Sequence, residues 1–155
     1  MGFIAAIRSG FMNYFKFSGR AVRSEYWYWV LFTFLAAIVF NIYDLYVFGL
    51  DLTPGATQFT PVTWAFQAIT FIPSIALGAR RLHDTNRSGW WQLLSLVAVS
   101  GPLAVAFLHF SAWALLTLAI IIILIVWFCE EGDDEENRFG INIFIARRHA
   151  GAEPA

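Results

Sequence analysis

The residues that could do chemistry in this chain are gathered in three short polar segments, and arginine is the commonest of them. A guanidinium group binds a phosphate or carboxylate through two parallel hydrogen bonds, so clustered arginines are typical of anion-binding sites. We interpret these segments as one candidate site for an anionic headgroup or a partner. Its residues are Arg20, Arg23, Glu25, Arg80, Arg81, His83, Asp84, Arg87, Asn137 and Arg138, with Glu136 beside them.

A plainer interpretation of the same residues stays open. Arginines near the ends of membrane helices often extend their charged tips to lipid phosphates, which anchors a protein without binding a particular ligand. In that case Glu25 and Asp84 pair with neighbouring arginines. The segments would then fix topology only.

His83 beside Asp84 resembles a general base held by a carboxylate. Adjacent residues on a helix do not face each other, however, so the pair alone is weak evidence for catalysis. No zinc-protease, serine-hydrolase, phosphate-loop or dinucleotide motif occurs in the sequence. We therefore predict a protein that is not an enzyme, with no cofactor and no metal site.

Two further ionisable residues lie in or beside apolar stretches. Asp44 falls near the outer end of an expected helix, and His109 interrupts a later apolar run. A carboxylate inside a membrane is costly and is a functional candidate by default. If both lie near the outer surface, a contact between them is a hypothesis for a proton-sensitive gate. The single cysteine, Cys129, excludes an internal disulfide, and we interpret it as a buried apolar residue.

The composition requires a membrane. Of 155 residues, 59% are hydrophobic, 18% aromatic and only 14% charged. A water-soluble domain of this size has too little interior to cover so many large apolar side chains. The net charge of −1 and the absence of a basic stretch interleaved with aromatic residues also argue against a nucleic-acid partner.

The apolar stretches predict an all-α fold, a polytopic bundle of transmembrane helices forming one domain over residues 1–155. Apolar residues at a spacing near 3.6 predict an amphipathic interfacial helix over 3–17. The long apolar run after the double tryptophan is about twice one crossing, so we divide it in two, with the break at either residues 100–102 or 109–111. The expected membrane helices are 26–48, 61–79, 90–108 and 112–128, followed by an acidic and then basic tail, 130–155.

Lysine and arginine predict the orientation, because cytoplasmic loops are rich in them. Four precede the first membrane helix, none lies in the loop 49–60, and three follow the second helix. The N-terminus is therefore expected in the cytoplasm. Four crossings also return the tail to that side, whereas three would place its arginines outside.

Three segments together resemble a bacterial inner-membrane family catalogued as domain of unknown function 805. The most specific is the central one, in which Arg-Leu-His-Asp is followed by Ser-Gly-Trp-Trp between two apolar helices. The resemblance covers roughly residues 13 to 140 and implies a bacterial inner-membrane location without an established activity. The segments are residues 17–27, 80–91 and 136–140.

The sequence thus predicts a non-enzymatic, multi-pass protein of the bacterial inner membrane, whose basic cytoplasmic face engages anionic lipid or a partner protein. The alternatives are a small oligomeric transporter or channel component and, third, an intramembrane enzyme. The expected partners are membrane lipids, together with a membrane protein or further copies of the chain.

Overall fold

The computed structural model describes residues 1–49, 58–95 and 110–141. This part of the chain is helical, with no strand beyond an isolated bridge between Asn137 and Gly140, so the predicted all-α class is confirmed. Its elements are α1 (Phe3–Met12), α2 (Arg23–Phe48), α3 (Pro61–Asp84), the 3₁₀ helix η1 (Gly89–Leu93) and α6 (Phe110–Cys129).

Helices α2 and α3 have the length and composition of membrane spans. With 26 and 24 residues they extend about 39 and 36 Å, more than the hydrocarbon core of roughly 30 Å. Helix α6, in which nine of 20 residues are leucine or isoleucine, is apolar on every side. Such helices belong in lipid.

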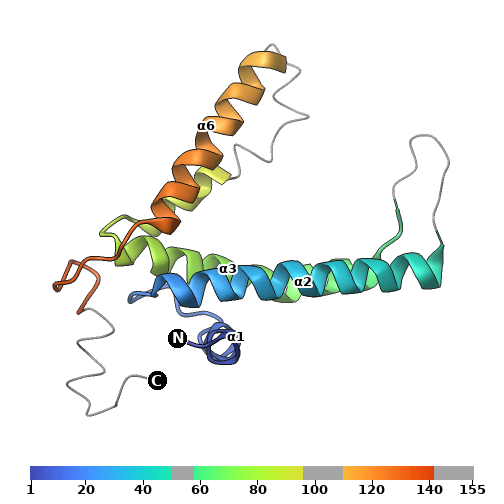
Figure 1. Ribbon diagram of the computed structural model, residues 1–155, viewed down its shortest axis with the longest axis horizontal. Coiled ribbons are helices and arrows are strands. Elements are labelled where there is room, and N and C mark those ends of the chain that lie inside the picture. The colour runs from blue at the N-terminus through green and yellow to red at the C-terminus, as the bar shows by residue number, and fades with distance from the viewer. Residues whose placement is uncertain (50–57, 96–109, 142–155) are drawn as a thin grey trace.

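Helices α2 and α3 form a long antiparallel pair, and α1 lies across it (Figure 1). In that view α1 is seen end-on against α2, while α2 and α3 run along the horizontal. Helix α6 starts away from the pair and reaches it at the C-terminal end of α3. There Leu82 packs with Ile120, Leu124 and Phe128 of α6. If the pair crosses the membrane, α1 lies along its surface.

Trp29 joins the first three helices. It is buried, its ring meets Phe11 of α1 edge-on at 5.1 Å, and its indole N–H donates to Ser74 Oγ of α3 at 2.9 Å. Gly10 of α1 lies directly against the same ring, where a Cβ atom would overlap the indole carbons. A glycine at this position lets α1 approach α2 closely.

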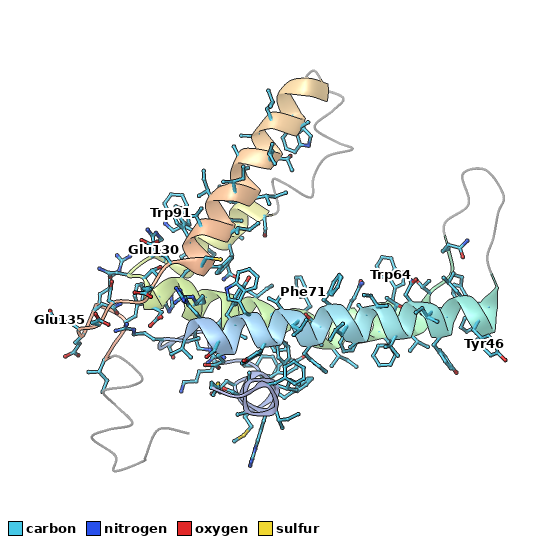
Figure 2. The ribbon with its side chains drawn as sticks, in the orientation of Figure 1. Tyr46, Trp64, Phe71, Trp91, Glu130 and Glu135 are labelled. Atoms are coloured by element: carbon cyan, nitrogen blue, oxygen red, sulfur yellow. The ribbon has the colours of Figure 1, made fainter. Side chains whose placement is uncertain are left out.

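The flanks of the α2–α3 pair expose large apolar side chains. Figure 2 shows Trp64 and Phe71 projecting from α3, and they are 69% and 58% exposed. An apolar surface of this extent is not stable in water, because it would drive association. Lipid therefore surrounds these exposed apolar side chains.

Three predicted boundaries differ from those observed. Helix α1 ends at Met12, not at residue 17, because the Asn13 amide turns back and donates to the Ser9 carbonyl at 2.9 Å. Helix α2 begins at Arg23, three residues earlier than expected, and α3 continues to Asp84, five residues later. The last residues of α3 stay helical because their polar side chains point into protein contacts described below.

The region after α3 is only partly described. The predicted helix 90–108 begins within η1, and its turn, including His109, lies outside the described residues. Helix α6 begins at Phe110, close to the predicted start at 112. The interpretation of Cys129 as buried is wrong: it ends α6 at the protein surface and is exposed.

Asp44 links the two helices where α2 ends and α3 begins. Its side chain is fully buried, and its two oxygens accept from the backbone N–H groups of Val62 at 3.1 Å and Thr63 at 2.8 Å. These groups lie in the first turn of α3, where a helix has no partners of its own for them. A carboxylate also suits the positive end of the helix dipole. Asp44 thus caps α3 from the neighbouring helix.

We predict that Asp44→Ala lowers the unfolding free energy by about 1 to 2 kcal/mol, the usual cost of losing a helix N-cap. The unfolding free energy of Asp44→Asn should lie between those of Asp44→Ala and the wild type, because the asparagine amide oxygen still accepts a hydrogen bond. Thermal unfolding in detergent micelles measures both. Asn41→Ala, on an exposed position one turn earlier, is the control; equal stability of Asp44→Ala and this control would refute the cap.

Candidate functional site

Two buried arginines share one aspartate at the C-terminal end of α3. Arg20 Nε lies 2.8 Å from Asp84 Oδ1, and an Arg81 terminal nitrogen lies 2.6 Å from Asp84 Oδ2. The side chains of Arg20, Arg81 and Asp84 are 1%, 0% and 7% exposed. We call these three residues the arginine clasp. Both carboxylate oxygens of the clasp are occupied, and it carries one excess positive charge.

The remaining donors of the clasp hold the chain that follows α6. Arg81 donates to the carbonyls of Phe128 and Glu130, and Arg20 donates to those of Asp133, Glu135 and Gly140. Asp84 contributes its own carbonyl, which accepts from the Asp133 N–H at 2.8 Å. Carbonyl dipoles thereby offset the excess charge. The acidic segment 130–136 is held mainly by its backbone, and five of its six acidic residues are exposed.

Gly132 permits this close contact. It lies against the Asp84 carboxylate, and a Cβ atom at residue 132 would overlap both carboxylate oxygens. A larger residue would push the 130–136 segment away from the clasp. The glycine between two acidic pairs is therefore a packing requirement.

Arg80 forms a second buried ion pair. One terminal nitrogen lies 3.3 Å from Glu25 Oε1, and that oxygen also accepts from Ser9 Oγ of α1 at 2.8 Å. The pair joins the first three helices. Arg80 Nε and its other terminal nitrogen are buried without a hydrogen-bond partner in the described part of the chain.

His83 connects the same segments without contacting Asp84 through its ring. Its Nδ1 lies 3.1 Å from the Gly19 carbonyl, and its ring stacks on Phe139 at 3.8 Å. Asn137 donates to the His83 carbonyl at 2.9 Å. The His83 ring is therefore a packing and bridging group, while the Asp84 carboxylate is bound by arginines.

Three arginines of the candidate site lie nearer the surface. Arg23 donates to the Cys129 carbonyl at 3.0 Å and lies 3.7 Å from Glu131. Arg87 pairs with Glu130 at 2.6 Å, and Arg138 donates to the Asn86 carbonyl at 2.8 Å. Each has a partner in the protein.

The structure brings the three polar segments together, but it buries basic side chains that were expected at the surface. Arg20, Arg80 and Arg81 are buried, whereas the acidic side chains of the loop after α6 are exposed (Figure 2 labels Glu130 and Glu135). The outer surface beside the clasp is therefore acidic. Its exposed acidic residues are Glu130, Glu131, Asp134, Glu135 and Glu136.

Asp44 does not join this site. It lies at the opposite end of the helix pair, where it caps α3, and its proposed partner His109 lies outside the described residues.

Sequence reasoning missed Ser9, Gly132 and the cap formed by Asp44. Ser9 and Gly132 carry no pattern that points to partners 16 and 48 positions away. The cap had a usable signal, because an antiparallel helix pair places the end of one helix beside the start of the next. Asp44 is four residues from the end of α2, and Thr63 is two residues into α3.

The comparisons with known proteins identify the family of this chain. The family model described as "Protein of unknown function (DUF805)" matches residues 14–141. The chain belongs to this family. The match includes the whole clasp and every residue of the candidate site.

Similar proteins of Escherichia coli carry inner-membrane names. The chain is 36% identical to inner membrane protein YhaI of strain K12 over 128 residues, which is 83% of this chain and 86% of that protein. It is 34% identical to inner membrane protein YhaH, over 83% of this chain and 87% of that protein. A shorter match, 32% over 85 residues, covers 54% of this chain and 51% of YiiR. No solved structure matches the chain.

We predict that Asp84→Asn lowers the unfolding free energy by about 3 to 5 kcal/mol, because it leaves two buried arginines without a counter-charge. The segment 130–141 should become accessible to protease well below the midpoint of thermal unfolding. Asp134→Asn removes the same charge from an exposed position and is the control. Matching proteolysis and unfolding curves for the two variants would show that the clasp does not hold the segment.

Proposed function

We propose that this protein is a non-enzymatic protein of the bacterial inner membrane that engages anionic lipid at its cytoplasmic face, and that α1 makes the contact. Family membership and the inner-membrane names of YhaI and YhaH support the location. The observation that carries the lipid contact is the outward face of α1.

This outward face combines apolar and cationic side chains. Ile4, Arg8 and Met12 recur every four residues and are all exposed, with Ile4 and Met12 at 74% and 72%. Lys16 follows the helix and is also exposed. Neither Arg8 nor Lys16 has an ion pair within the described ranges. Apolar side chains beside unpaired cations suit the boundary between acyl chains and anionic headgroups.

The buried arginines are poorly placed for the same role. Arg20 and Arg81 are bound to Asp84 and to backbone carbonyls, and a lipid phosphate would have to displace those contacts. Changes in lipid binding after substitution of Arg81 would therefore report on the fold of this region. The exposed cations Arg8 and Lys16 are therefore the better candidates for the lipid contact.

The geometry of His83 and Asp84 does not form the base and carboxylate pair of a catalytic site. His83 does not contact the Asp84 carboxylate, and both Asp84 oxygens are held by arginines. A general base needs a free lone pair within reach of a substrate. The Asp84 carboxylate therefore serves structure and does not act as a base.

The orientation follows from the charges at the two ends of the helix pair. The basic residues before α2 and after α3 meet at one end, as the contact of Arg20 with Asp84 requires. The sequence 49–60 at the other end contains neither lysine nor arginine. Because positive residues are retained in the cytoplasm, we place the clasp and α1 inside.

Cysteine accessibility checks this orientation in a Cys129→Ser background. We expect Ser18→Cys and Glu135→Cys to react only after the membrane is permeabilised, and Phe59→Cys to react in intact spheroplasts. All three positions are exposed on the protein. Labelling of Ser18→Cys in intact spheroplasts would reverse the orientation, and opposite results for Ser18→Cys and Glu135→Cys would separate the segments that the clasp joins.

We expect Arg8→Gln/Lys16→Gln to lose preference for phosphatidylglycerol over phosphatidylcholine by about fivefold for each charge, since one basic residue at an anionic surface contributes roughly 1 kcal/mol. Spin-labelled lipids in vesicles measure the preference. The matched control is Arg87→Gln/Arg138→Gln, which removes two charges that have protein partners. An unchanged preference in the first variant, or the same loss in both, contradicts the role of α1.

A further inference from the structure

A cavity of about 630 Å³ opens between the start of α2 and the loop that the clasp holds. Its volume is in the range of small-molecule sites. The side chains around it include one cation, two exposed carboxylates and two aromatic rings. It is lined by Val22, Arg23, Ser24, Trp27, Tyr28, Asp84, Glu131, Gly132 and Asp134.

One side of the cavity suits a phosphate. Helix α2 begins there, and Val22 before it provides no side-chain cap, so the first N–H groups of a 26-residue helix lack that partner. The N-terminus of such a helix attracts negative charge. Arg23 of the first turn adds a half-exposed guanidinium group. Ser24 adds a hydroxyl group, whose oxygen accepts from the Met1 ammonium at 3.3 Å and whose hydrogen remains available to donate.

The other side suits an ammonium group. Asp134 and Glu131 present exposed carboxylates, and Asp134 has no ion pair among the residues described. Trp27 and Tyr28 line the same cavity and are each 37% exposed, and aromatic faces attract cations. The cavity thus carries complementary charges for a zwitterion.

The pairing of Arg23 is loose enough to be exchanged. Its terminal nitrogen lies 3.7 Å from Glu131, and the two side chains are 48% and 90% exposed. Exposed pairs of this kind contribute little to stability. A zwitterionic ligand would replace this one contact with two, phosphate to Arg23 and ammonium to Glu131.

The inner wall of the cavity is fixed. Asp84 lines it with its carboxylate already bound to Arg20 and Arg81, and Gly132 is packed against that carboxylate. The clasp therefore holds the loop that carries Glu131 and Asp134 opposite the start of α2. A site whose supporting residues are already ordered binds at a smaller entropic cost.

From this arrangement we infer that the cavity binds the headgroup of an aminophospholipid, with its phosphate at the start of α2 and its primary ammonium between Glu131, Asp134 and the rings of Trp27 and Tyr28. Aromatic residues at the beginning of a membrane helix lie at the level of lipid headgroups. The cavity is therefore within reach of a lipid in the same leaflet.

Native mass spectrometry of the full-length protein in micelles tests the inference. Dioleoyl phosphatidylethanolamine and dioleoyl phosphatidylglycerol share acyl chains and phosphate but differ in the ammonium group. We expect the wild type to retain the ethanolamine lipid preferentially. Glu131→Gln/Asp134→Gln should reduce that preference about tenfold, because hydrogen bonds to charged groups are worth more than neutral ones.

The control for charge is Glu135→Gln/Glu136→Gln, which removes two exposed carboxylates from the same loop outside this cavity. It should keep the preference of the wild type. Equal retention of the two lipids by the wild type, or an equal loss of preference in both double variants, would overturn the inference.

Soluble O-phosphoethanolamine identifies the source of the headgroup. Displacement of the lipid by this compound would show that the headgroup alone is bound. Retained preference without displacement would show that the acyl chains are also needed, as for a lipid held at the membrane surface. The inference and the proposed function are separable, because Arg8→Gln/Lys16→Gln leaves every residue of the cavity unchanged.

Discussion

The described structure depends on the burial of two guanidinium groups against a single carboxylate at the end of α3. Asp84 neutralises one charge, and the backbone carbonyls of the chain after α6 offset the other. Buried charges tolerate no missing partner, because the cost of desolvating them is then uncompensated. The arrangement therefore requires three distant segments to be in place at once. Residues before α2, at the end of α3 and after α6 form one unit for this reason.

The helix pair is closed at its opposite end by a related use of a buried carboxylate. Asp44 satisfies two N–H groups of the first turn of α3, so that α2 carries the cap its neighbour lacks. Between the two ends, packing around Trp29 and its bond to Ser74 holds α1 and α3 to α2. Polar contacts thus set the register of the pair, while the outward faces are left apolar. This division suits lipid, in which apolar packing alone gives helices little reason to associate.

The direction of the side chains reverses the basic character expected for the face that the polar segments form. Arginines supply the basic composition of its segments, yet the clasp and the Arg80–Glu25 pair turn three of them inward. The surface around the loop after α6 is acidic, and within the described residues the cations without an ion pair or hydrogen-bond partner, Arg8 and Lys16, lie on and beside α1. The two proposed contacts, one with anionic lipid and one with an ammonium-bearing headgroup, therefore fall on different parts of the same face.

The sequence by itself determined the helical membrane class, the positions of α2 and α3 and the grouping of the polar segments at helix ends. Helix rise and bilayer thickness are general quantities, so the length of an apolar stretch shows whether it can span a membrane. It could not decide which arginines are buried. Arg20 and Arg23 are alike as residue types, and only contact with a loop more than 100 positions away buries one and leaves the other half exposed. The boundaries of α3, the exposure of Cys129 and the fit of Gly132 were decided in the same way, since each depends on which residues distant in the sequence lie nearby.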